Sequence, residues 1–263
     1  MARLKSDLEI RSDGRNAVAD RAIEILLSFT DDRPVLTAGE LCEANGMSRS
    51  TIYRYLTSLR AGGFIAEEPG RGFRLGPKLI EMARIARKGN SILEIAEPHI
   101  HQLANRCGEI VQLVERVGRQ TIMLDNIESK HRIGITYLRG QVLPSPLGAS
   151  AKVLTAFAPP EEFEELLRSV DLQAYTPRSI VDPQELRRQL ELVRANGYAY
   201  NDEELDEGIR AVAAPIFGRF SVRYSVAIVG PTFRLTDEKL PEFIEMVKDT
   251  ATQISRSLKE HET

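Results

Sequence analysis

Apolar residues recur at helical spacing in two short segments near the start of the chain. In the first, Ala38, Leu41 and Cys42 share one face of a helix. Thr37 precedes that face and Glu40 follows three residues later, which is the spacing of a capping box. The pattern therefore predicts a short helix that starts after Thr37 and buries one side.

The second segment has the same periodicity and opens after a turn. Asn45-Gly46 tolerates the left-handed backbone of a tight turn, and Ser48 can cap the next helix. Ile52, Leu56 and Leu59 then recur at i, i+4 and i+7, so they predict its buried face. The start and the opposite side of this helix carry hydrogen-bonding groups, namely Arg49, Ser50, Thr51, Tyr53, Arg54 and Thr57.

A β-hairpin is predicted directly after the second helix. Gly62-Gly63 ends the helix, and residues 64–66 and 73–75 read as two strands around a Pro-Gly turn. Arg71 at the tip and Arg74 on the second strand are placed to contact phosphates. This order is that of a winged helix-turn-helix, which puts its second helix into the DNA major groove. A helical hairpin with a solvated polar face is the alternative.

Two further helices are predicted around this region. Residues 20–29 have one apolar face, which predicts a helix packed under the recognition pair. Residues 77–88 are apolar on more than one side, which favours a linker helix that also forms a dimer. A helix merely wedged between two domains fits that pattern equally well. The predicted division is a flexible arm at 1–17, a winged helix-turn-helix at 18–76, a linker helix at 77–90 and a second domain at 91–263.

From residue 91 onward, helical and strand-like patterns alternate. The spacing predicts helices at 92–106, 150–157, after Pro159-Pro160, at 182–195 and from Thr236 towards the end. It predicts strands at 110–116, 121–127, 133–137, 198–201, 209–216 and 224–229. Strands grouped at both ends around helices are typical of one α+β domain with a central antiparallel sheet.

Charge divides the chain into two parts. The formal net charge of −3 excludes a uniformly basic nucleic-acid binder. Residues 1–90 hold 15 Lys and Arg against 12 Asp and Glu, whereas the remainder holds 20 against 26, so only the amino-terminal part suits DNA. Cys42 and Cys107 follow no secretory segment, and no apolar stretch approaches the ~20 residues of a membrane span. A reduced, cytoplasmic protein is therefore expected.

Catalysis is the main alternative class of function. The acidic run at 202–207 could supply paired carboxylates, but a solvated helix or loop face explains it. His99 and His101 could be metal ligands, but at i, i+2 on a helix two imidazoles point about 200° apart and cannot share an ion. Ser145 and Ser150 have no nearby His and no nucleophile elbow. We predict no catalytic residue, metal or cofactor; an orphan small-molecule hydrolase or lyase fused to a DNA-binding module is the alternative.

Three motifs in the first 76 residues form a set. Residues 48–59 fit the helix pattern S-x-S-T-x-x-R-x-L-x-x-L, residues 63–65 fit G-[YF]-[IL], and residues 73–76 fit Y/F-x-L-G. Together they resemble the DNA-binding domain of the IclR family of bacterial transcription regulators. Tyr53 stands where that family usually has His, and it keeps a ring with a polar tip. The resemblance implies that the helix beginning at Ser48 is the recognition helix.

Further motifs continue through the rest of the chain. They are Cys107-Gly108-Glu109, Gly140 through Pro144, residues 149–152 for A-x-G-K, residues 203–215 for E-E-x-x-x-G-[IV]-x-x-[IV]-A-[AV]-P, and Gly230-Pro231. These resemble the effector domain of the same family, although Ala151 replaces the usual Gly. The resemblance implies a GAF-like effector-binding and oligomerisation domain and dimers that pair into tetramers. By position, the effector-lining residues would be Arg132, Ile135, Ala149, Ser150, Asn201, Ile209, Ala211, Ala227 and Val229.

The resemblance implies a repressor or activator that binds a double-stranded DNA operator under the control of a small organic acid. Relatives that sense small keto-acids carry acidic, thiol or hydroxyl groups where this chain has Asn201, Ala211, Ala227 and Val229. A carboxylate entering such a pocket would lose water without regaining hydrogen bonds. We therefore expect a larger, aromatic or partly apolar carboxylate from a catabolic pathway, with Arg132 as an ion-pair donor. The other interpretation is that these alanines and valines are only core.

Overall fold

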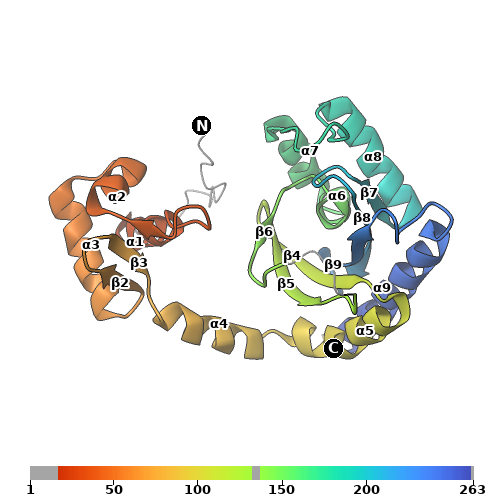
Figure 1. Ribbon diagram of the computed structural model, residues 1–263, viewed down its shortest axis with the longest axis horizontal. Helices are drawn as coiled ribbons and strands as arrows, with labels where there is room; N and C mark the ends of the chain where they lie inside the picture. The colour runs from red at the N-terminus through yellow and green to blue at the C-terminus, as the bar shows by residue number, and fades with distance from the viewer. Residues whose placement is uncertain (1–16, 132–136, 262–263) are drawn as a thin grey trace. The chain divides into compact units, whose positions relative to one another are not determined.

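The computed structural model describes residues 17–131 and 137–261. The chain divides between Asn90 and Ser91 into two compact units (Figure 1). The arm predicted at residues 1–17 falls, up to residue 16, outside the described residues. The same holds for Arg132, for Ile135 and for most of the strand predicted at 133–137.

The amino-terminal unit is a helix-turn-helix with a small sheet. Its elements are α1 (Ala17–Leu27), β1 (Val35–Leu36), α2 (Ala38–Asn45), α3 (Arg49–Ala61), β2 (Ile65–Glu68), β3 (Gly72–Leu75) and α4 (Lys78–Lys88). The strands form an antiparallel sheet in the order β1-β3-β2. The hairpin β2–β3 is the predicted wing, whereas the two-residue β1 was not predicted. The helix predicted at 20–29 ends at Leu27, and Phe29 still lies in the core.

The predicted caps of the helix pair are confirmed. The Thr37 hydroxyl accepts a hydrogen bond from the Glu40 N–H, and a Glu40 carboxylate oxygen accepts one from the Thr37 N–H at 2.8 Å. Gly46 adopts φ = 62°, the left-handed conformation that ends α2. The Ser48 hydroxyl accepts from the Thr51 N–H at the start of α3. These local bonds fix the angle at which α3 leaves the turn.

The core of this unit lies beneath α3. Ile52 and Leu56 are buried as predicted, and Leu59 is partly buried. Tyr55 is also buried, which the spacing did not predict. Because one side of α3 is packed in this way, its opposite side is left to solvent.

The carboxy-terminal unit is built on one six-stranded antiparallel sheet in the order β6-β5-β4-β9-β8-β7. Its helices are α5 (Ser91–Cys107), α6 (Ala149–Ala156), α7 (Pro160–Ser169), α8 (Pro183–Asn196) and α9 (Leu240–His261). Its strands are β4 (Ile110–Val117), β5 (Gln120–Ile127), β6 (Val142–Leu143), β7 (Ala199–Asp202), β8 (Ile209–Phe217) and β9 (Val222–Pro231). The predicted α+β class with a central antiparallel sheet is confirmed.

Most predicted bounds in this unit differ from the observed ones by one or two residues, but the start of the last helix and the strand β6 differ more. The last helix was predicted from Thr236, but it begins at Leu240. Residues 236–239 form a turn in which the Thr236 carbonyl accepts from the N–H groups of Lys239 and Leu240. The strand β6 was not predicted, because two residues are too few to show a period.

Helices cover both faces of the sheet (Figure 1). Val111, Leu113 and Val226 belong to the apolar cluster formed with α5 and α9. Alternate residues on the other face, such as Ala211 and Ala227, belong to the cluster that includes α6, α7 and α8. The sheet residues on this second face are mostly small, so α6 can lie close to the sheet.

Candidate DNA-binding helix and effector cavity

The predicted DNA-contacting residues of α3 lie on its exposed side. Arg49, Ser50, Tyr53, Arg54 and Thr57 are exposed, with Tyr53 at 46% of its full accessibility. The Arg54 guanidinium lies over the Tyr55 ring, 5.7 Å from its centroid. The Thr57 hydroxyl donates to the Tyr53 carbonyl at 2.8 Å. The face therefore presents a guanidinium and a phenol supported by the packed side of the helix.

Thr51 and the wing residues Arg71 and Arg74 differ in their exposure and in the side chains that they already contact. Thr51 is partly buried and its hydroxyl is 2.9 Å from that of Ser48, so it belongs to the cap of α3. Arg71 is exposed at the tip of the β2–β3 hairpin. Arg74 is exposed but forms an ion pair with Glu68. A phosphate would have to compete with Glu68 for Arg74.

In the carboxy-terminal unit, the predicted effector residues that the structure describes come together. Ala149, Ser150, Asn201, Ile209, Ala211, Ala227 and Val229 all line one cavity of about 50 Å³ between α6 and the sheet. We call this space the α6 cavity. The remaining two, Arg132 and Ile135, lie outside the described residues. Whether these side chains contact an effector stays a prediction.

The α6 cavity is apolar apart from a few polar groups. The Gln112 side-chain nitrogen and the Ser150 hydroxyl are buried and have no hydrogen-bond partner in the described part of the chain. The Asn201 side-chain oxygen accepts from the Glu204 N–H at 2.8 Å. Burial, together with the nearby Asp206 carboxylate, raises the pKa of the Tyr137 phenol to about 12. The Tyr137 phenol is thus neutral and can donate a hydrogen bond near neutral pH.

The first turn of α6 forms one wall of this cavity. Gly148 at the N-cap has φ = 80° and no side chain that could cap the helix. Leu205 closes over it, because a Cβ placed on Gly148 would lie 2.8 Å from a Leu205 methyl carbon. The backbone N–H groups at a helix N-terminus favour negatively charged ligands.

Several lining residues were not predicted. Gln112, Tyr137, Leu205 and Asp206 line the α6 cavity but were absent from the expected set. Gln112 had a visible signal, because it is a polar residue within the apolar run 110–114. The other three lie in loops, where no periodicity marks the direction of a side chain.

The prediction that the acidic run is a solvated face is wrong for Glu204. Glu204 is 6% exposed and forms an ion pair with Lys152, which is 0% exposed. Lys152 also donates to the Tyr200 carbonyl, and burial lowers the pKa of its ammonium although Glu204 opposes that shift. A fully buried Lys needs such partners, because an unpaired charge in the interior is costly. The sequence pattern could not show this pairing, since 52 positions separate the two residues.

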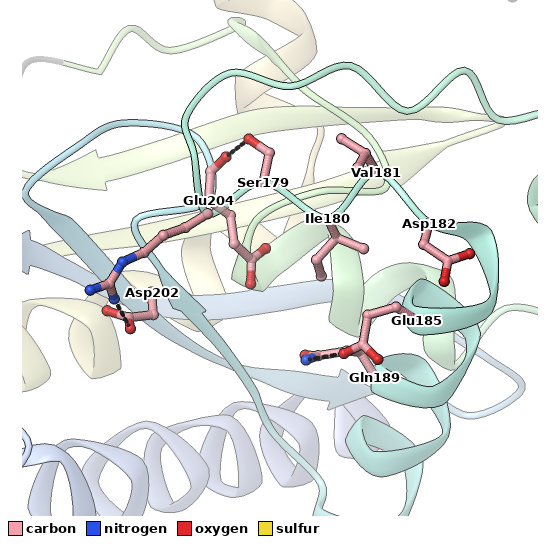
Figure 2. A pocket seen from close by; sticks show the side chains of 9 residues that line it. Ser179, Ile180, Val181, Asp182, Glu185, Gln189, Asp202 and Glu204 are labelled. Atoms are coloured by element: carbon pink, nitrogen blue, oxygen red, sulfur yellow. Dashed lines mark hydrogen bonds and ion pairs between the residues drawn. The ribbon is translucent and has the colours of Figure 1, made fainter.

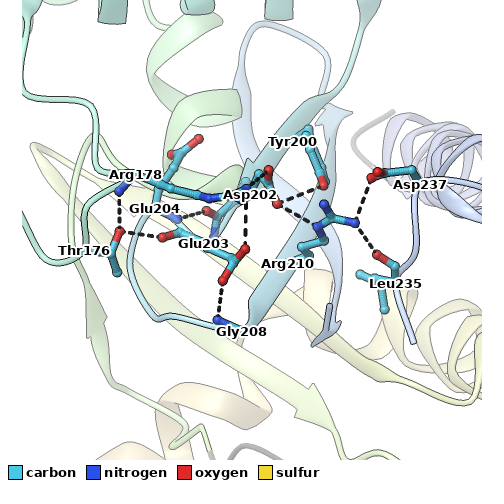
Figure 3. Close-up of polar contacts among 11 residues, drawn as sticks. Thr176, Arg178, Tyr200, Asp202, Glu203, Glu204, Gly208, Arg210, Leu235 and Asp237 are labelled. Atoms are coloured by element: carbon cyan, nitrogen blue, oxygen red, sulfur yellow. Dashed lines mark hydrogen bonds and ion pairs between the residues drawn. The ribbon is translucent and has the colours of Figure 1, made fainter. Parts of the chain in front are cut away.

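Neighbouring acids of this run are also engaged (Figure 3). Asp202 accepts hydrogen bonds from Arg178 and, at 2.6 Å, from Arg210. Glu203 accepts one from the Gly208 N–H at 2.7 Å. Asp206 and Glu207 are exposed, as a solvated loop requires.

The remaining candidates for chemistry are dispersed. The His99 ring nitrogen is 3.2 Å from the Gln253 side-chain oxygen, and no group of three His, Cys, Asp or Glu among the described residues could hold a metal ion. Cys42 and Cys107 are free thiols, and burial raises the pKa of Cys107 to about 11. In the described segments no helix is long and apolar enough to cross a bilayer.

Comparisons with known proteins match both units. The IclR helix-turn-helix domain matches residues 18–69, and the domain described as bacterial transcriptional regulator IclR C-terminal matches residues 86–256. The HTH-type transcriptional regulator KipR of Bacillus subtilis (strain 168) is 31% identical over 234 residues, which cover 89% of this chain and 94% of KipR.

Solved structures match most of the length of this chain. The crystal structure of the Thermotoga maritima IclR is 32% identical, with a TM-score of 0.67 over 92% of this chain and 98% of that one. An IclR homologue from Microbacterium hydrocarbonoxydans, solved as a complex with 4-hydroxybenzoate, has a TM-score of 0.76 over 93% of this chain and 100% of that one. At 23% identity, this second likeness shows the fold alone.

Proposed function

The chain belongs to the IclR family of DNA-binding transcriptional regulators, and we propose that its α6 cavity binds a carboxylate effector with an aromatic or partly apolar body. Both of its domains and its relatives are those of transcriptional regulators and not of enzymes, so the protein is a regulator. In this proposal α3 enters the major groove of an operator, and the effector sets the affinity for that operator.

The observation that carries the proposal is the pair of buried polar atoms in the α6 cavity. The Gln112 amide nitrogen and the Ser150 hydroxyl have no partner among the described residues, and a buried polar group without a partner costs about 1–3 kcal/mol. A carboxylate at the first turn of α6 would accept hydrogen bonds from both and would lie at the positive end of the helix. Such a ligand removes the cost of both buried groups at once.

The rest of the lining supports an apolar body. Ala211, Ala227 and Val229 offer no hydrogen bonds from their side chains, so a second charged end would be desolvated without compensation. The cavity of about 50 Å³ is smaller than the 300–1,000 Å³ typical of small-molecule pockets. An aromatic acid must therefore widen the rim, where Leu143 and Leu205 are only partly buried. Widening gives the effector a differential affinity for two conformations, which is what control of DNA binding requires.

Calorimetry with the full-length protein tests this proposal. We expect 4-hydroxybenzoate or benzoate to bind more tightly than glyoxylate and pyruvate; 4-hydroxybenzoate is chosen because a protein of the same fold was solved with it. Ser150→Ala and Gln112→Leu should each weaken the binding of the aromatic acid about tenfold, since a hydrogen bond to a charged group contributes roughly 1.5–3 kcal/mol.

Ser225→Ala is the matched control for these variants. The Ser225 hydroxyl is also buried without a partner in the described residues, but it does not line the α6 cavity. It should therefore leave effector binding unchanged. Tight glyoxylate binding would refute the size argument, and full binding by both cavity variants would refute the site.

We also propose that the protein works as a dimer that pairs into a tetramer, with dimerisation through α4. Ile80 is 76% exposed, Met82 46% and Ile85 52%, so α4 exposes large apolar side chains on more than one of its sides. A recognition helix contacts few base pairs, and two copies about 34 Å apart would read a two-fold operator. Light scattering should detect smaller species for Ile80→Glu than for the parent chain. An unchanged molar mass would contradict dimerisation through α4.

A further inference from the structure

A second hollow lies on the carboxy-terminal unit (Figure 2), and no residue that lines it also lines the α6 cavity. It holds about 460 Å³, which lies within the range of small-molecule sites. Its walls are the loop before α8, the start of α8 and the segment after β7. We call it the acidic groove, and it is lined by Arg178, Ser179, Ile180, Val181, Asp182, Glu185, Gln189, Asp202 and Glu204.

The charged groups of the acidic groove are predominantly carboxylates. Asp182, Glu185, Asp202 and Glu204 line it, against the single guanidinium of Arg178 among the residues that the structure describes there. Arg178 already has carboxylate partners, because it forms an ion pair with Asp202 and its Nη1 lies 3.4 Å from Oε1 of Glu203. The side chains that line the groove therefore carry more carboxylates than cations, although Lys152, Arg188 and Arg210 also form ion pairs with three of these carboxylates.

Glu204 supplies the observation that points to a ligand. Its side chain is more than nine-tenths buried, and one carboxylate oxygen pairs with Lys152. The other oxygen, Oε2, has no hydrogen-bond partner within residues 17–131 and 137–261. Figure 2 shows the Glu204 carboxylate directed into the space between the loop and α8. A desolvated carboxylate oxygen favours a donor, preferably a charged one.

The other acids are held in place without being saturated. Glu185 receives two hydrogen bonds from Arg188, at 2.7 and 2.9 Å, and one from Gln189 at 3.0 Å. Asp182 caps α8 by accepting from the Gln184 N–H at 3.0 Å. A carboxylate offers about four lone-pair sites, so these groups can accept further hydrogen bonds from a ligand. Ile180 and Val181 add an apolar wall.

We propose that the acidic groove is a second ligand site, which binds a small organic ammonium compound through Glu204, Glu185 and Asp182. The ammonium group donates to the free Glu204 oxygen, and the carbon chain lies along Ile180 and Val181. The site differs from the α6 cavity in charge and in size, so the two sites bind ligands of different chemistry.

Isothermal titration calorimetry of the full-length protein with 1,4-diaminobutane tests the proposal, with butane-1,4-diol as the neutral probe of the same length. We expect saturable binding of the diamine and none of the diol. Glu185→Gln should weaken diamine binding at least tenfold, and Asp182→Asn should weaken it while keeping a residue that caps α8. These variants carry the test because Glu204→Gln would also remove the partner of buried Lys152.

Glu164→Gln is the matched control. Glu164 is a carboxylate held by two hydrogen bonds from Arg187, at 2.8 and 2.7 Å, as Glu185 is held by Arg188, but it does not line the groove. Both variants change the net charge of the protein equally, so any difference between them reports on the groove. Only Glu185→Gln should weaken the binding of the diamine. Ser150→Ala should also leave the diamine unaffected. The proposal would be overturned if the diamine does not saturate the protein or if the diol binds equally well. It would also be overturned if Glu164→Gln weakens diamine binding as much as Glu185→Gln does, or if Ser150→Ala weakens it.

Discussion

The two units of this regulator present their candidate sites in opposite ways. On α3, Tyr53 and Arg54 are large, polar and exposed. In the α6 cavity, Ala211 and Ala227 are small, apolar and buried. A DNA duplex meets the surface of a folded domain, whereas a small molecule must be enclosed. The candidate DNA-contacting side chains therefore lie outside the core of their unit, whereas the candidate effector-lining side chains are part of the core of theirs.

Electrostatics shows the same contrast. Lys78 and Glu81 on α4 form an ion pair in which both side chains are 43–51% exposed. Lys152 and Glu204 form one in which they are 0% and 8% exposed. An exposed ion pair contributes about 0–1 kcal/mol to the free energy of unfolding. Removing one partner of a buried pair lowers that free energy by about 3–5 kcal/mol. Replacing a single residue in each pair is the strongest way to sharpen the comparison.

Lys152→Met should produce the largest effect. It leaves the Glu204 carboxylate buried without its partner, and we expect a loss of about 3–5 kcal/mol in the free energy of unfolding. Urea unfolding followed by circular dichroism measures it. Lys78→Met, the exposed counterpart, should stay within about 1 kcal/mol of the parent. Adding Glu204→Leu to Lys152→Met should recover part of the loss, and an equal loss from both single variants would remove the contrast between the units.

Arg54→Ala should produce the next largest effect, on DNA binding rather than on stability. If Arg54 reads a base, its loss costs roughly 1–3 kcal/mol of discrimination between operator and random DNA. Arg71→Ala at the wing tip should instead weaken both DNAs alike and flatten the salt dependence. Fluorescence anisotropy with the two duplexes at several salt concentrations separates these outcomes. A proportional loss for both duplexes with Arg54→Ala would identify a phosphate contact.

The contrast also explains how much of the molecule was predictable from sequence. On α3, the buried positions Ile52 and Leu56 repeat with the helical period, so the exposed face follows by geometry. Thr37 and Ser48 predicted the helix starts because capping is local chemistry. The wing followed from glycines and two short apolar runs.

The α6 cavity was less accessible to such reasoning. Ala211 and Ala227 lie on strands buried on both faces, where an apolar run gives no period. Only the family resemblance selected them, and it missed Gln112. The pairing of Lys152 with Glu204 depends on how α6 packs against the segment after β7, and no local pattern encodes that contact.

Thr37→Ala should have a smaller effect, confined to the amino-terminal unit. It removes the hydroxyl of the capping box of α2, and loss of an N-cap costs about 1 kcal/mol. Hydrogen exchange of the α2 amides measures that local free energy. Thr252→Ala is the control, because the Thr252 hydroxyl is exposed and, among the described residues, donates a hydrogen bond only to the Lys248 carbonyl within α9. Thr252→Ala should not destabilise the carboxy-terminal unit. If the α2 amides of Thr37→Ala keep the hydrogen-exchange protection of the parent chain, the capping role of Thr37 is contradicted.

Tyr137 gives the smallest effect, because it is silent at neutral pH. Burial and the Asp206 carboxylate raise its pKa to about 12, whereas an unfolded tyrosine ionises near pH 10. A folded-state pKa raised in this way adds stability that is complete below about pH 10 and is lost as pH rises towards 12. Alkaline titration at the phenolate absorbance band should therefore lose a step near pH 12 in Tyr137→Phe. If that step is unchanged, the phenol is not buried at the α6 cavity, and the enclosed character of the carboxy-terminal site is weakened at its rim.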